Sequence, residues 1–240
     1  MLPSALSRQQ DLELRYRSAA VRDLLATGVR VARSRGLSEV NRDSVTTTLA
    51  VGLGRLYEIV LGLRNLKLHG QWAPQTDGVG PFLPDLLSMH DAVFDFLSLS
   101  SQDPGEATRW LSRINTDPTV PRLVSALSAY WDCAAAGPAS THGTVRAWND
   151  VEGAVQPTPE EPALNILGGP NGEPAEYLAW RRAVSTSRSS ARSSTGERLA
   201  DAVEAIWFAL GICGRDGALG RPGEVFAAEV LPIRATLAAA

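Results

Sequence analysis

The sequence predicts an all-α fold, a helical bundle with a long Pro/Gly-rich loop and additional C-terminal helices. Apolar residues recur at helical spacing through most of the 240 residues, and no strand-like alternation reaches a convincing length. Residue types suited to helix starts and ends flank these periodic segments. We expect a helical bundle over 1–136, a loop or linker over 137–173, and C-terminal helices over 174–240 that pack on the bundle.

The first helix is expected to begin at Ser4 or Ser7 and to end at Gly36. Ser7 and Gln10 have the spacing of a capping box, in which two side chains satisfy free backbone N–H groups. Steps of four and three residues connect the positions expected to be buried. These positions are Leu14, Ser18, Val21, Leu25, Gly28 and Ala32.

A second face of this helix carries arginine at every seventh position, namely Arg8, Arg15 and Arg22. One interpretation is a solvated face on which Asp11 supports Arg15 at i,i+4 spacing. The other is a ridge that faces phosphate, because a guanidinium can bind phosphate through two parallel hydrogen bonds.

The second helix is expected from Asn41 or Ser44 to Gly70, since glycine commonly follows the last helical turn. Further helices are expected over 82–99, around 105–113 and over 119–136, the last after Asp117-Pro118. In the second helix the positions expected to be buried are Val45, Leu49, Leu53, Leu56, Val60 and Leu63.

The stretch from Gly137 to Pro174 contains six prolines and six glycines, which predicts an irregular loop or linker. Residues 174–192 are weakly helical, and the run STSRSSARSST predicts a flexible connector. Ser194 and Glu197 have capping-box spacing before a helix expected to stop at Gly211 or Gly214. A last helix is expected over roughly 222–238.

Charge is distributed unevenly, although the formal net charge is only −3. Residues 1–72 carry +5, residues 73–180 carry −10 and residues 181–240 carry +2. This pattern predicts complementary docking within or between chains, or an anionic ligand near the first helices. The excess is too small for a general nucleic-acid coat, while the 44% hydrophobic content excludes a wholly disordered chain.

No run of about 18 apolar residues is present, so a membrane span is not expected. The chain reaches Arg8 without an apolar segment, so no secretory signal is expected and a cytoplasmic location is predicted. Cys133 and Cys213 match no metal-binding or disulfide spacing. Neither a metal nor a cofactor is therefore expected.

The three histidines have different contexts. His142 is expected in a solvated loop, and His90 is expected to be a satisfied, half-buried residue of the third helix, with a metal or haem ligand as its alternative. The sequence contains no HExxH motif, phosphate-binding loop or dinucleotide fingerprint. His69 differs because it belongs to the segment LGLRNLKLHGQW, in which Arg64, Asn65 and His69 have the order R-N-x3-H.

That order suits the cleavage of RNA without a metal. The reaction needs a base for the ribose 2′-hydroxyl, an acid for the leaving oxygen, and a cation for the charge that builds on phosphorus. Histidine titrates near neutral pH and can serve as base or acid, while arginine suits the phosphate.

The segment resembles the signature of the HEPN superfamily, all-α domains with an R-x4–6-H motif. The resemblance implies a metal-independent endoribonuclease, or an RNA- or nucleotide-binding protein, whose two motifs meet across a homodimer interface. Such proteins are frequently toxins or defence effectors. By this resemblance Arg64 would bind phosphate, His69 would act as general base or acid, and Asn65 would orient them. The tyrosine found two residues after the histidine in one subgroup is here Gln71.

Residues five apart on a continuous helix point about 140° away from each other. Arg64 and His69 therefore converge only if the helix unwinds near Leu68 or if a partner subunit supplies one of them. The alternative is that His69 and Gly70 simply end the helix, with Arg64 paired to an acid such as Asp85.

Two other functions stay open from the sequence. A non-catalytic helical interaction or regulatory protein would show an exposed apolar patch, involving Trp110, Trp131 or Trp180, where a protein partner docks. A helical haem-dependent oxygenase would use His90, His69 or His142 as its axial ligand.

Overall fold

The computed structural model describes residues 6–35, 37, 40–72, 85–101, 105–136, 144–155 and 174–232, with side chains for all of these except 34, 35, 133–136, 144–146 and 174–194. These described residues form eight α-helices and no strand, which confirms the all-α prediction. In chain order the helices are α1 (Arg8–Arg35), α2 (Arg42–His69), α3 (Leu86–Ser100), α4 (Glu106–Thr116), α5 (Thr119–Ala136), α6 (Thr144–Val155), α7 (Pro174–Arg215) and α8 (Arg221–Val230).

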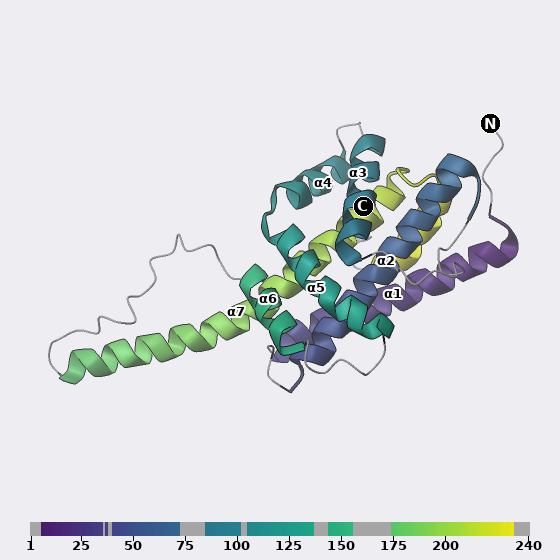
Figure 1. The fold of residues 1–240 in the computed structure, drawn as a ribbon. Helices are drawn as coiled ribbons and strands as arrows, with labels where there is room; N and C mark the ends of the chain where they lie inside the picture. Colours follow the sequence, from purple (N-terminus) through teal and green to yellow (C-terminus); the bar gives the residue numbers. More distant parts are fainter. Residues whose placement is uncertain are drawn as a thin grey trace.

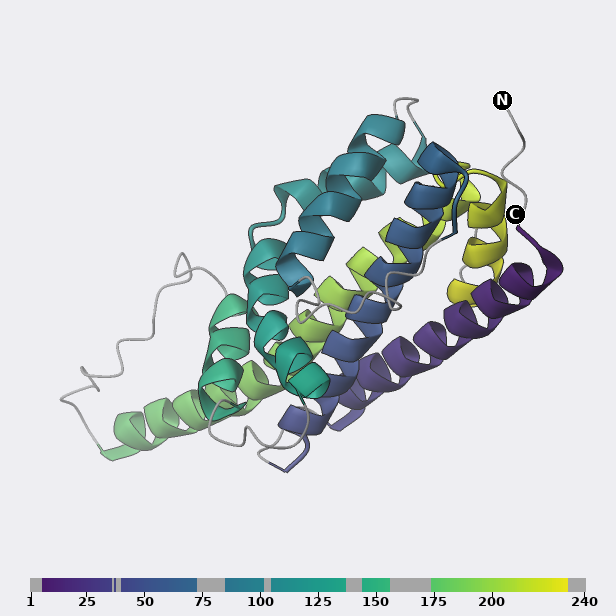
Figure 2. The same cartoon turned by 45° about the vertical axis from the view of Figure 1, so that its right-hand side comes forward.

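Helix α2 lies at the centre of the bundle, in contact with α1, α3, α5 and α7 (Figures 1 and 2). It runs antiparallel to α1, and α7 and α8 also pack on α1. Helix α4 packs on α7, and α6 packs on α5. The aromatic side chains of Tyr57, Tyr130, Trp207 and Phe226 are almost completely buried and so connect α2, α5, α7 and α8 through the core.

The predictions for α1 and α2 are confirmed in detail. The Ser7 backbone N–H donates to Gln10 Oε1 at 2.9 Å, and the Gln10 N–H donates to Ser7 Oγ at 3.3 Å, which is the expected capping box. All the positions predicted to be buried in these two helices are buried. A Cβ at Gly28 would lie under 3.0 Å from Leu49, so glycine there permits the close approach of the two helices. Gly36, the predicted end of α1, lies outside the described residues.

The next three helices lie close to their predicted positions. Asp85 caps α3 by accepting a hydrogen bond from the Ser88 N–H at 2.9 Å, so α3 starts at Leu86, while 82–84 are outside the described residues. Helix α4 extends to Thr116, three residues beyond the prediction. Asp117 Oδ1 accepts from the Thr119 N–H at 2.8 Å, which fixes the predicted start of α5.

Helix α6 lies inside the stretch predicted to be an irregular loop or linker, so the prediction is wrong over Thr144–Val155. This segment has no proline and only one glycine. The count of both residue types over all 38 residues does not show that this part of the stretch is almost free of helix breakers. Its apolar residues recur at helical spacing and are buried against the rest of the bundle. They are Ala147, Trp148, Val151, Ala154 and Val155.

Helix α7 corrects two further predictions. It runs without interruption from Pro174 to Arg215, so the serine-rich run is helical and no new helix begins at Ser194. Serine is only mildly unfavourable in a helix, and no proline follows Pro174 within α7 to break it. Figure 1 shows the first half of α7 extending beyond the other helices.

The predicted helix stops at Gly211 and Gly214 are also wrong, because α7 passes through both. A Cβ at Gly211 would lie under 3.0 Å from Leu231, and one at Gly214 would lie 2.8 Å from the Gly223 carbonyl oxygen. These glycines therefore allow the chain after α7 to fold back closely. The turn itself uses Gly217 (φ 82°), and α8 then ends at Val230 rather than near 238.

None of the helices in the described part of the chain is both long enough and apolar enough to cross a membrane.

Candidate functional site

The carboxyl end of α2 carries the R-N-x3-H motif on an unbroken helix. The helix continues through His69, and Gly70 ends it in the left-handed conformation (φ 71°) while its N–H donates to the Leu66 carbonyl at 2.9 Å. The unwinding near Leu68 that would bring Arg64 and His69 together within one chain does not occur. The two side chains leave the helix in directions about 140° apart.

Arg64 is half-buried beside α3. Its guanidinium carbon lies 5.7 Å from the centre of the Phe96 ring, and Lys67 Nζ lies 5.9 Å from the same ring. Lys67 also donates to the Ala218 carbonyl at 2.8 Å. The expected ion pair with Asp85 is absent, because that carboxylate caps α3. No described carboxylate forms an ion pair with Arg64, so its charge remains available to an anion.

Asn65 and His69 lie on the side of α2 next to the turn that follows it. The Asn65 amide donates to the Gln71 carbonyl at 3.2 Å and so ties this turn to the helix. Trp72 packs close to Gly62. His69 is exposed and forms no hydrogen bond or ion pair with a described residue. On the continuous helix, the Asn65 side chain leaves about 100° from Arg64 and about 40° from His69, and its amide is held by the Gln71 carbonyl.

His90 is a core residue. Its Nδ1 lies 2.8 Å from the Tyr57 hydroxyl, and its ring centre lies 4.4 Å from that of Phe94. Burial lowers the pKa of His90 to about 4, so the imidazole is neutral near pH 7. The sequence predicted a satisfied, half-buried histidine, and the structure contains a satisfied histidine that is more deeply buried than predicted. His142, another of the three candidate haem ligands, lies outside the described residues.

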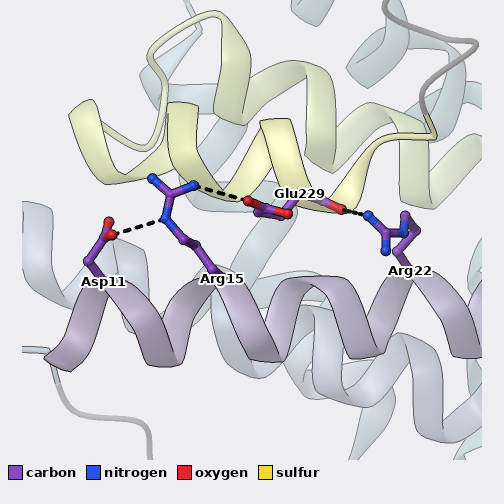
Figure 3. Close-up of polar contacts among 4 residues, drawn as sticks. All are labelled: Asp11, Arg15, Arg22 and Glu229. Atoms are coloured by element: carbon purple, nitrogen blue, oxygen red, sulfur yellow. Dashed lines mark hydrogen bonds and ion pairs between the residues drawn. The ribbon is translucent and has the colours of Figure 1, made fainter. Parts of the chain in front are cut away.

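Arg15 and Arg22 do not form a ridge that faces phosphate. Figure 3 shows both side chains reaching α8, where Arg15 bonds the Glu229 carboxylate at 3.0 Å and Arg22 donates to the Glu229 backbone carbonyl at 2.9 Å. Asp11 supports Arg15 at 3.0 Å, as the alternative interpretation predicted. These two arginines join α1 to α8.

An apolar groove lies between α1 and α2. It has a volume of about 430 Å³, and Val21, Leu24 and Ile59 contribute to its lining. Tyr16 at its edge is 77% exposed. This is an exposed apolar surface of the kind expected of an interaction protein. Of the three tryptophans predicted to form such a patch, Trp110 and Trp131 do not line this groove, and Trp131 is buried against α2. The side chain of Trp180 is outside those described.

A second cavity, of about 300 Å³, brings together three arginines that the sequence did not single out. Arg113 comes from the last turn of α4, Arg122 from the first turn of α5, and Arg198 from α7. Since Arg122 and Arg198 are 76 positions apart, no local motif could have predicted their meeting.

The described residues contain no group of three or more histidine, cysteine, aspartate or glutamate side chains suited to a metal ion. Burial raises the pKa of the Cys213 thiol to about 12, so this thiol is not a nucleophile near neutral pH. Comparison of the chain with models of protein families, with curated proteins and with solved structures gives no match.

Proposed function

We propose that this chain is a HEPN-like, metal-independent endoribonuclease that works as a homodimer, with the two α2 ends facing each other. The observation that carries the proposal is the state of the motif at the end of α2. His69 is exposed, and Arg64 has no ion-pair partner among the described carboxylates. An acid–base group and a free phosphate-binding group thus lie within six residues of each other on one rigid helix.

A twofold axis can bring these groups together without unwinding the helix. Positions 64 and 69 are about 7.5 Å apart along the helix axis. If two α2 ends pack antiparallel about an axis midway between these positions, Arg64 of each copy lies level with His69 of the other. Antiparallel packing of two chains thus brings Arg64 near His69, although the two side chains point apart within one chain.

The surface of α2 between the Arg64 and His69 side chains suits such packing. Leu68 projects about 40° from Arg64, and Leu61 about 60°, both toward the His69 side. Leu68 is 53% exposed and Leu61 is partly buried, so an apolar strip lies between the two functional side chains on the Arg64 side, with Asn65 between this strip and His69. Covering this strip with a second copy would bury apolar surface and leave each Arg64–His69 pair at its edge.

The chemistry of such a pair follows from its groups. His69 takes the proton of the ribose 2′-hydroxyl, or gives a proton to the 5′-oxygen that leaves, and Arg64 binds a non-bridging phosphate oxygen. The 2′-oxygen forms a bond to phosphorus as the bond to the 5′-oxygen breaks. The products are a 2′,3′-cyclic phosphate and a 5′-hydroxyl.

The test is cleavage of RNA in the presence of a chelator. We expect cleavage with cyclic-phosphate products, and we expect His69→Ala and Arg64→Ala to lower the rate by about 10²–10⁴-fold. Arg109→Ala, which removes an exposed arginine of α4, is the matched control and should cleave at the wild-type rate. An inactive wild-type protein, or full activity in His69→Ala with unchanged circular dichroism, would refute the proposal.

A further inference from the structure

We propose that the cavity between α4, α5 and α7 is a binding site for a small organic phosphate, such as a nucleoside monophosphate. This site is separate from the motif on α2. The proposal stands on three features of the cavity: the convergence of Arg113, Arg122 and Arg198, the engagement of the nearby carboxylates, and an apolar floor.

The three guanidiniums are held in place but keep most of their donors. Arg122 Nε donates to the Pro118 carbonyl at 3.0 Å, and one terminal nitrogen of Arg198 donates to the Val155 carbonyl at 3.4 Å. A guanidinium has five N–H donors, so several remain on each side chain. The guanidinium carbon of Arg113 lies 5.4 Å from the Trp110 ring centre. Groups positioned beforehand lose less entropy when an anion binds.

Each of the two carboxylates that line the cavity already accepts a hydrogen bond. Asp117 Oδ1 accepts from the Thr119 N–H at 2.8 Å and caps α5. Asp201 Oδ1 accepts from Arg33 of α1 at 2.6 Å. None of the three cavity arginines forms an ion pair with a described carboxylate. The lining therefore combines three arginines that form no ion pair with a described carboxylate with two aspartates that each accept a hydrogen bond from another residue, so positive charge exceeds negative charge and favours an anion.

The floor of the cavity indicates that the ligand is more than an inorganic ion. Ile114, Val155 and Ala202 are buried residues in the lining. A volume of about 300 Å³ is at the lower end of the range for small-molecule sites. An apolar floor beside an arginine cluster matches a phosphate monoester whose organic body covers the floor while its phosphate contacts the guanidiniums.

The experiment measures binding by calorimetry on a chain in which Arg64→Ala and His69→Ala have removed the groups of the α2 motif. The probes are adenosine 5′-monophosphate, adenosine and inorganic phosphate. We expect the monophosphate to bind more tightly than either of the others. Arg122→Ala and Arg113→Ala should each weaken its binding at least about tenfold, whereas the control Arg109→Ala should not.

Three results would overturn this inference. Adenosine binding as tightly as its monophosphate would show that the arginines do not contribute, and phosphate binding as tightly would show that the floor does not. An equal loss in Arg109→Ala would place the binding elsewhere. Every chain used in the calorimetry lacks Arg64 and His69. A negative binding result therefore does not refute the proposed ribonuclease function, and a negative cleavage result does not refute this binding site.

Discussion

The Tyr57 hydroxyl and His90 Nδ1 lie 2.8 Å apart inside a core made mostly of apolar side chains. A buried hydrogen bond of this kind contributes about 1 kcal/mol, but the loss of one partner leaves a buried polar atom unsatisfied at a larger cost. Burial raises the pKa of Tyr57 and lowers that of His90, so both groups stay neutral over the ordinary pH range.

The lowered pKa of His90 predicts a loss of stability in mild acid. The unfolded chain binds a proton at this histidine below about pH 6.5, whereas the folded chain binds it only near pH 4. Between these values the unfolded state holds more protons, so stability falls as the pH falls. From pH 7 to pH 5 the expected loss from this residue is about 2 kcal/mol. Urea unfolding at both pH values measures it.

His90→Gln removes the titrating group while keeping a side chain able to hydrogen-bond Tyr57. We expect its free energy of unfolding to change less between pH 7 and pH 5 than that of the wild type. The same change in both proteins would show that other groups cause the acid sensitivity.

Glycine residues on the helices determine how closely neighbouring helices approach each other. A Cβ at Gly54 of α2 would lie under 3.0 Å from three atoms of the Trp131 ring in α5. Gly153 of α6, by contrast, has nothing within 4 Å of that position. The two positions therefore separate the cost of overpacking from the intrinsic helical preference for alanine.

Gly54→Ala should lower the free energy of unfolding by about 1–2 kcal/mol, because overpacking outweighs the gain in helix propensity. Gly153→Ala should raise it by about 0.5–1 kcal/mol, since only the gain remains. Chemical denaturation of the two variants measures both values. A stabilised Gly54→Ala protein would mean that α2 and α5 are less tightly packed than the structure shows.

Local sequence signals predicted the helices that carry their own caps and apolar stripes. The capping box of Ser7 and Gln10 and the glycine after His69 are signals of this kind, and the structure contains both. Composition over a long window does not predict helix α6 or the serine-rich part of α7, because it does not register that helix breakers are few or absent within these shorter segments.

The candidate sites depend on contacts that no local pattern contains. The sequence identified Arg64 and His69, but Phe96 beside Arg64 comes from a different helix. Arg113, Arg122 and Arg198 meet only because α4, α5 and α7 pack together, and the attachment of Arg15 and Arg22 to Glu229 depends equally on the position of α8.

At the scale of the whole molecule, ion pairs between distant segments join the bundle. Arg33 of α1 pairs with Asp201 and Glu204 of α7, and Arg215 at the end of α7 pairs with Glu106 of α4. The sequence predicted docking between the basic first third and the acidic middle, whereas the described long-range ion pairs of α1 are with residues of the last third. Such exposed pairs contribute about 0–1 kcal/mol each, so they orient helices that apolar burial holds together.

A heterodimer tests most directly whether two chains share the proposed ribonuclease site. Arg64→Ala and His69→Ala chains, co-expressed with different tags and purified by both, contain one intact Arg64–His69 pair per dimer. The geometry predicts RNA cleavage at about half of the wild-type rate, although each variant alone is inactive. A heterodimer as inactive as its two parents, or a chain that forms no dimer, would contradict the claim.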